Sequence, residues 1–102
     1  MTEHQFAGKT VIVPGAAGGL GRAFAQGFAA AGARLVVADI DESGVRETAS
    51  LLASSGAEAH PVRVDVTDKA STDALAKAAI DAFGSIDVLV NNAGYGLFGA
   101  IE

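Results

Sequence analysis

The residues with the clearest chemical meaning form a glycine cluster near the N-terminus. Gly15, Gly18, Gly19 and Gly21 lie between an apolar, β-branched run at residues 10–13 and a helix-type pattern. A strand that leads into a glycine turn, followed by a helix N-terminus with free N–H groups and a positive dipole end, is how proteins hold a pyrophosphate. Glycine and alanine are common throughout this chain, so the spacing alone is a modest signal. Its place between a strand and a helix nevertheless favours phosphate binding.

A second candidate binding residue is Asp39, which ends the next apolar run at residues 34–38. It follows Gly21 at close to the separation of about 20 residues expected for an acid that binds a ribose. A carboxylate there can accept hydrogen bonds from both adenosine ribose hydroxyls and would repel a 2′-phosphate, so NAD is favoured over NADP. Neither Arg22 nor Arg34, the nearest bases, directly follows Asp39, where it could clamp a 2′-phosphate. The alternative is that Asp39 merely begins a turn.

Two further polar positions follow later apolar runs. Asp65 comes after residues 59–64 and could accept a hydrogen bond from an adenine amino group while Val66 packs on the ring. A helix-capping role for Asp65 is the equal alternative. Residues 91–94, Asn-Asn-Ala-Gly, follow the run at residues 86–90. Asn pairs often only make turns, but small residues there would also let a nucleotide lie across the edge of a sheet.

The elements that would position these residues alternate regularly along the chain. Apolar runs predict strands at residues 10–13, 34–38, 59–64 and 86–90, with a helical pattern between each pair. This order, β-α-β-α-β-α-β, predicts a parallel sheet with right-handed crossovers. The carboxyl ends of the strands then meet in one crevice, where open α/β sheets bind ligands. A flavodoxin-like unit, with a different strand order, would show much the same periodicity.

The predicted helices carry recognisable start and stop signals. Asp41 can cap the second helix, Thr67 or Asp68 can cap the third, and Gly84 can end it. Pro61 places its strand at the sheet edge, because proline cannot donate to a ladder. The apolar faces predicted for the helices, in chain order, are Leu20, Phe24, Gly27, Phe28 and Ala31; Val45, Ala49 and Leu52; and Leu75, Ala78, Ala79, Ala82 and Phe83.

The composition predicts a single globular domain over residues 1–102, with 50% hydrophobic and 19% charged residues. A net charge of −5 argues against a nucleic-acid partner. The absence of cysteine excludes disulfides and thiolate catalysis, and His4 and His60 are too isolated to predict a metal site. There is no signal-peptide pattern and no apolar run of about 18 residues. We therefore expect a cytoplasmic protein without a membrane partner.

Taken together, these residues resemble the short-chain dehydrogenase/reductase family. The resemblance extends from about Phe6 to the end of the chain, and its most family-specific part is the Asn-Asn-Ala-Gly segment at residues 91–94. It implies a Rossmann-like three-layer α/β fold with a partial parallel sheet of strand order 3-2-1-4, and NAD lying over the glycine turn. The cofactor-binding residues that it implies are Gly15, Gly18, Gly19, Leu20, Gly21, Asp39, Ile40, Asp65, Val66, Asn92, Ala93 and Gly94.

Two features depart from the family pattern. Pro14 stands where the family usually has threonine, and proline lacks both that hydroxyl and an N–H, so we expect a displaced or loosened glycine turn. The family also relies on a catalytic Ser and a Tyr-x-x-x-Lys pair. Here Tyr95 is followed four positions later by Gly99, and no lysine comes after Lys77. We therefore predict no catalytic residue in this chain and no activity for the chain alone.

The leading interpretation is the cofactor-binding half of an NAD-dependent oxidoreductase. The complete protein would transfer a hydride between nicotinamide and a carbonyl or secondary alcohol. The alternatives are a non-catalytic nucleotide-binding module and a non-functional truncated fragment. Because the apolar strand at residues 86–90 would form an open sheet edge, we also expect self-association through that edge and the adjoining uncovered face.

Overall fold

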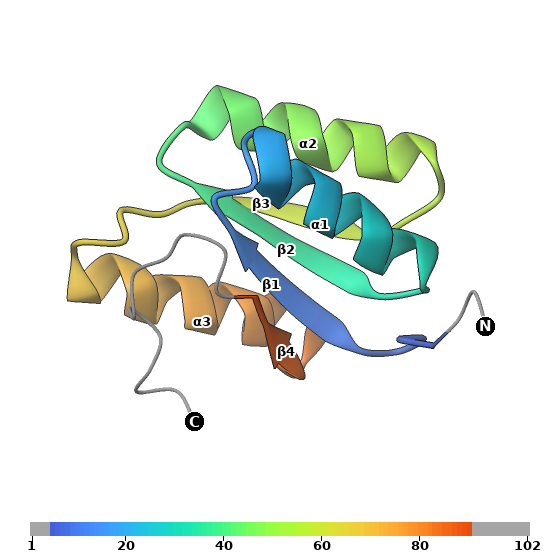
Figure 1. Ribbon diagram of the computed structural model, residues 1–102. Coiled ribbons are helices and arrows are strands. Elements are labelled where there is room, and N and C mark those ends of the chain that lie inside the picture. The colour runs from blue at the N-terminus through green and yellow to red at the C-terminus, as the bar shows by residue number, and fades with distance from the viewer. Residues whose placement is uncertain (1–4, 91–102) are drawn as a thin grey trace.

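The computed structural model describes residues 5–90, and residues 1–4 and 91–102 lie outside the described part. Its strands pair in parallel in the order β3-β2-β1-β4, so the predicted fold class and strand order are confirmed (Figure 1). In chain order the elements are β1 (Thr10–Pro14), α1 (Gly19–Ala30), β2 (Arg34–Asp39), α2 (Glu42–Ser54), β3 (Ala59–Arg63), α3 (Lys69–Phe83) and β4 (Val88–Leu89).

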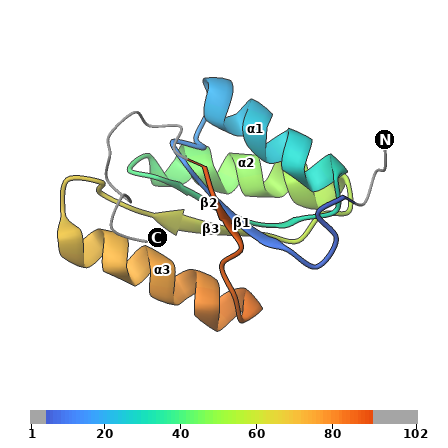
Figure 2. The same ribbon diagram turned by 60° about the horizontal axis from the view of Figure 1, so that its bottom comes forward.

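Helices cover both faces of the sheet, with α1 and α2 on one face and α3 on the other (Figures 1 and 2). Successive side chains of a strand point to opposite faces, so β1 and β2 supply two separate cores. The core under α1 and α2 contains Val11, Val13, Ala16, Ala25, Ala33, Leu35, Val37, Val45, Ala49 and Leu52. The core under α3 contains Ile12, Val36, Ala38, Val64, Leu75 and Ala79.

Short polar side chains and a glycine set the ends of α2 and α3. Asp41 caps α2 by accepting a hydrogen bond from the Gly44 N–H at 3.0 Å. Of the two caps predicted for α3, the structure uses Asp68, which accepts from the Ala70 N–H at 3.0 Å. Gly84 ends α3 with φ of 85°, a left-handed conformation that costs glycine little. The local signals in the sequence therefore predicted these boundaries correctly.

The predicted apolar stripe of α1 is right only in part, because Phe28 packs against the core as predicted but Leu20 and Phe24 do not face it. Gly21 and Ala25 are buried against the sheet, whereas Leu20 is 64% and Phe24 37% exposed. Small residues on the inner face let the helix backbone approach β1 and β2 closely, and Leu20 and Phe24 are turned outward. In α3, Leu75 and Ala79 are buried as predicted, but the predicted inward residue Ala82 is exposed.

The two prolines fit the sheet because of where their missing N–H groups would point. Pro61 lies on β3, which is an edge strand of the described sheet as predicted. The predicted loosening at Pro14 is wrong, because β1 pairs with β2 up to Pro14 and Ala38, and the Ala16 N–H then donates to the Ala38 carbonyl at 3.0 Å. Alternation along β1 turns the missing donor of Pro14 toward β4, whose pairing with β1 ends at Ile12 and Leu89.

β4 is shorter than predicted, because a side chain replaces its first ladder bond. The Asp87 carboxylate accepts a hydrogen bond from the Thr10 N–H at 2.8 Å, and the Asp87 N–H donates to the Thr10 carbonyl at 2.9 Å. The Thr10 N–H also holds the pKa of Asp87 below its ordinary value. Regular pairing begins at Val88. Self-association through this edge stays a prediction. In the described part of the chain, no helix is long and apolar enough to cross a membrane.

Candidate functional site

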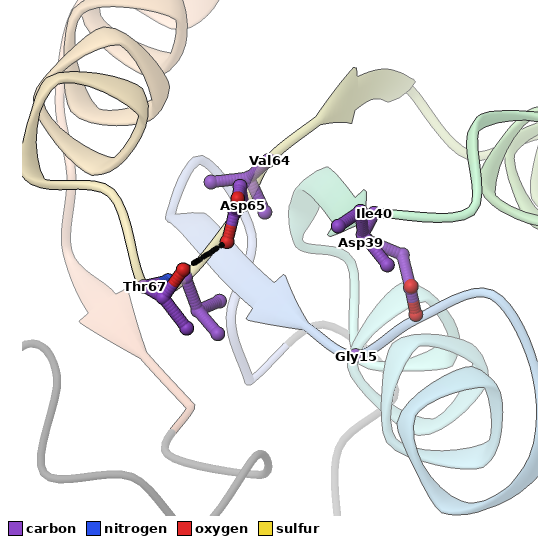
Figure 3. Close-up of a pocket in the computed structure, with 7 residues that line it drawn as sticks. Gly15, Asp39, Ile40, Val64, Asp65 and Thr67 are labelled. Atoms are coloured by element: carbon purple, nitrogen blue, oxygen red, sulfur yellow. Dashed lines mark hydrogen bonds between the residues drawn. The ribbon is translucent and has the colours of Figure 1, made fainter.

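A pocket of about 370 Å³ lies at the carboxyl ends of β1, β2 and β3. Its size is within the range of about 300–1,000 Å³ typical of small-molecule sites. It brings together residues from three separate strand ends, and the outermost of these residues, Gly15 and Thr67, are 52 positions apart in sequence (Figure 3). The lining residues are Gly15, Asp39, Ile40, Val64, Asp65, Val66 and Thr67.

Five of the predicted binding residues line this pocket, and the others fall elsewhere. Gly18, Gly19, Leu20 and Gly21 lie at the start of α1, directly after the turn that leaves β1. Asn92, Ala93 and Gly94 lie outside the described residues. The five predicted residues that line the pocket are Gly15, Asp39, Ile40, Asp65 and Val66. The predicted convergence of the strand ends is therefore present in the fold.

The glycine turn carries the chain from β1 into α1. Gly15 has φ of 70°, a conformation that favours glycine because it has no Cβ. Gly18 is the N-cap residue of α1, and no side chain of the described residues caps the helix through a hydrogen bond. The first N–H groups of a helix lack partners within the helix itself. Together with the helix dipole, they offer an anion a place to bind.

Asp39 connects the end of β2 to the glycine turn. Its Oδ2 accepts a hydrogen bond from the Ala17 N–H at 3.1 Å, and its Oδ1 accepts one from the Asp41 N–H at 3.0 Å. Figure 3 shows the carboxylate directed toward the chain that follows Gly15. An ionised carboxylate has about four lone-pair positions, so each oxygen can still accept another donor. Asp39 thus forms the local turn considered as an alternative, and it also contacts the glycine turn.

Asp65 lies on the opposite side of the pocket, after β3. Its Oδ1 accepts hydrogen bonds from the Thr67 hydroxyl at 2.7 Å and the Thr67 N–H at 3.0 Å (Figure 3). These two bonds, the hydroxyl's first, hold the pKa of Asp65 below its ordinary value, with a smaller contribution from Arg63. Asp65 is therefore ionised at neutral pH and can act as an acceptor. It does not cap α3, because that role belongs to Asp68.

Sequence reasoning missed several residues that shape this region. The sequence predicts Thr67 only as a candidate helix cap, although an aspartate often accepts from the backbone two residues later in a turn, and this signal points to Thr67. Thr48 bonds to the glycine turn from α2, 32 residues away from Ala16, and nothing in its sequence surroundings marks it. Arg22 directly follows the last motif glycine, and the sequence suggests for it only the role of a phosphate clamp. In the described residues, no group of His, Cys, Asp or Glu could hold a metal ion.

The chain belongs to the short-chain dehydrogenase family, whose model matches residues 9–102. It is 47% identical over 85 residues to galactitol 2-dehydrogenase of Agrobacterium fabrum, which covers 83% of this chain and 32% of that protein. It is 46% identical over 86 residues to sorbitol dehydrogenase of Cereibacter sphaeroides, covering 84% and 32%. The chain thus spans about a third of the length of these curated relatives.

Solved structures show the same similarity. A short-chain dehydrogenase/reductase from Burkholderia phymatum, in complex with NAD, superimposes with a TM-score of 0.85 at 47% identity, covering 88% of this chain and 32% of that one. Hydroxysteroid dehydrogenase from Escherichia coli gives a TM-score of 0.86 at 38% identity, covering 92% and 38%. The family identified from the sequence motifs is thereby confirmed.

Proposed function

We propose that this chain is the cofactor-binding part of an NAD-dependent oxidoreductase that transfers a hydride between nicotinamide and a carbonyl or secondary alcohol. The observation that carries the proposal is the pocket itself, which joins Gly15, Asp39 and Asp65 from three strand ends. The solved relative in complex with NAD supports the same cofactor class. When bound, the dinucleotide would supply the hydride chemistry, and the residues of this chain would hold and orient it.

Each part of the cofactor has a suitable partner. Asp65 would accept from the adenine amino group, with Val66 against the ring, and Asp39 would accept from the adenosine ribose hydroxyls. The diphosphate would lie at the start of α1, on the backbone of residues 18–21. Ile40 would form part of the apolar wall of the adenosine pocket. Residues 92–94 are proposed, on the family resemblance alone, to lie near the second ribose.

We propose NAD rather than NADP as the preferred cofactor. The ionised carboxylate of Asp39 would stand close to the 2′ position of the ribose, where it stabilises a hydroxyl and repels a phosphate. Arg22, the basic residue that directly follows the last motif glycine, donates to the carbonyls of Ala17 and Gly44 and to Glu47. Its guanidinium is therefore already occupied.

Calorimetric titration of the chain with NAD, NADP and ADP-ribose tests the binding proposal. We expect NAD and ADP-ribose to bind with similar affinity, because both carry the adenosine diphosphate, and NADP to bind more weakly. An absence of heat at millimolar NAD would contradict the proposal. The oxidoreductase part is tested by fusing the chain to the region of the galactitol 2-dehydrogenase that follows its matching segment. Reduction of NAD by a polyol would support it, and no turnover despite NAD binding would favour a non-catalytic module.

A further inference from the structure

The carbonyl groups of the glycine turn are held by two side chains from the helices that follow it. The Thr48 hydroxyl donates to the Ala16 carbonyl at 2.6 Å, and an amino group of Arg22 donates to the Ala17 carbonyl at 2.7 Å. Arg22 is in the first turn of α1, and Thr48 lies on α2. Two successive carbonyls of the turn are therefore bonded to side chains of two different helices, α1 and α2.

Arg22 and Thr48 also bond to each other. The Arg22 Nε–H donates to the Thr48 hydroxyl oxygen at 2.8 Å, and the hydroxyl hydrogen goes to the Ala16 carbonyl at 2.6 Å, the nearer of two acceptors, since the Gly44 carbonyl lies at 3.2 Å. Thr48 is completely buried and the Arg22 side chain is 23% exposed. A hydrogen bond to a fully buried hydroxyl is costly to break, since the separated hydroxyl loses a partner without gaining water. The pair is thus a fixed connection between α1, the turn and α2.

The amide groups of the same two residues are engaged as well. The Ala16 N–H donates to the Ala38 carbonyl at 3.0 Å and the Ala17 N–H to Asp39 at 3.1 Å. Packing is equally close, because a Cβ added to Gly44 of α2 would come within 2.7 Å of the Ala17 Cβ. The backbone of residues 16 and 17 is therefore fixed on every side by the protein, and it offers no donor to a ligand.

We propose that Arg22 and Thr48 are positioning residues for the diphosphate of the cofactor, an inference that rests on the proposed function. Neither residue contacts the nucleotide. By fixing residues 16 and 17, they hold the following backbone, residues 18–21, in the arrangement that receives the phosphates. A loop ordered before binding has less conformational freedom to lose, so its ligand binds more tightly. Most of the adenosine pocket is formed at the ends of β2 and β3. It meets the residues held by this pair through Asp39, which accepts from the Ala17 N–H, so we expect it to depend on the pair much less than the phosphate-binding backbone does.

The competing explanation is that Arg22 acts through its positive charge. Thr48→Val distinguishes the positioning explanation from the charge explanation, because it removes the hydroxyl with little change in volume and none in charge. Arg46→Gln is the matched control for Arg22→Gln. Both changes remove one positive charge, but Arg46 pairs with Glu42 on the outer side of α2, where its side chain is 68% exposed. Thr48→Ser restores the hydroxyl and serves as the conservative rescue.

The experiment measures dissociation constants for ADP-ribose and for adenosine by NMR titration of the full 102-residue chain. ADP-ribose contains the diphosphate, whereas adenosine occupies only the pocket beside Asp39 and Asp65. We expect Arg22→Gln and Thr48→Val to weaken ADP-ribose binding by about tenfold and to weaken adenosine binding far less. Thr48→Ser and Arg46→Gln should bind both ligands like the wild type.

Three results would overturn the inference. Adenosine affinity could fall in parallel with ADP-ribose affinity, which would show a general structural loss. Arg46→Gln could weaken ADP-ribose binding as much as Arg22→Gln does, which would show an effect of charge alone. Thr48→Val and Arg22→Gln could both bind ADP-ribose like the wild type. If Thr48→Val does not fold, Arg22→Gln decides the question against Arg46→Gln. Failure of the wild type to bind either ligand would instead refute the proposed function.

Discussion

The two sides of the pocket are built by different kinds of contact. On the side of the glycine turn, Asp39 bonds to the Ala17 N–H, 22 residues earlier in the chain. On the side of β3, Asp65 bonds to Thr67, two residues later. The first carboxylate connects two elements and the second completes a local turn. The same residue type at equivalent strand ends therefore has a tertiary role in one place and a local role in the other.

The two hydrophobic cores of the sheet also differ, in how many buried residues their helices contribute. The core under α1 and α2 combines buried residues from two helices, including Ala25, Val45 and Leu52. The core under α3 receives only Leu75 and Ala79 from its helix as fully buried residues of the described part. Because α3 is held by so few buried side chains, removing one of them should destabilise the protein strongly. This is the largest effect that we expect.

Leu75→Ala should lower the free energy of unfolding by about 2–5 kcal/mol, the usual cost of removing a fully buried leucine. Leu75 is 0% exposed, whereas Ile80 on the same helix is 47% exposed. Ile80→Ala is therefore the matched control and should change stability far less. Urea unfolding measures both. Hydrogen exchange should also show a greater loss of protection in α3 than in α2, and equal loss in both helices would contradict the comparison.

Asp39→Ala should weaken NAD binding by about 1–3 kcal/mol, because a charged acceptor is lost. It should also shift the NMR signal of the Ala17 amide, which loses its acceptor. Asp65→Ala should weaken binding less and leave the Ala17 amide unchanged, since the Asp65 carboxylate bonds only to Thr67 among the contacts described. Calorimetry and amide spectra of both variants measure the difference. Identical spectral changes would show that the two sides are not independent.

The smallest expected effect concerns the titration of Asp65. Its hydrogen bonds to Thr67 lower its pKa in the folded protein. A carboxyl whose folded pKa is lowered stabilises the fold above its unfolded pKa, and this contribution disappears as the pH falls through the folded value. Thr67→Val removes the hydroxyl donor but keeps the N–H, so the pKa of Asp65 should rise toward its ordinary value. A carbon-detected NMR titration measures this, with Asp87 as the unchanged reference.

The sequence was most informative where a signal depends on neighbouring residues. The helix caps, the parallel order of the strands and the convergence of Asp39 and Asp65 follow from patterns that can be found along the chain. The inner face of α1 could not be predicted in this way, because periodicity measures hydrophobicity rather than size. The sheet accepts Gly21 and Ala25 because a close approach requires small side chains, and it leaves Leu20 and Phe24 outside.

Two other features, the effect of Pro14 and the bond between Arg22 and Thr48, could not be predicted because they depend on how the chain is arranged in space. The effect of Pro14 was mispredicted because it is determined by the side toward which the missing N–H would point, and that side follows only from the register of β1. The bond between Arg22 and Thr48 joins residues 26 positions apart. No local pattern encodes such a contact, so it became visible only in the folded arrangement.

The close approach of α2 to the glycine turn has a consequence for how this sequence can vary. A methyl group at Gly44 would come within 2.7 Å of the Ala17 Cβ and 2.6 Å of Asp41 Oδ2. Gly44 and Ala17 are therefore expected to change as a pair during evolution or engineering, since Ala17→Gly would remove one of the two collisions that Gly44→Ala creates. A library that varies Gly44 alone would mostly sample proteins in which α2 and the glycine turn have been forced apart.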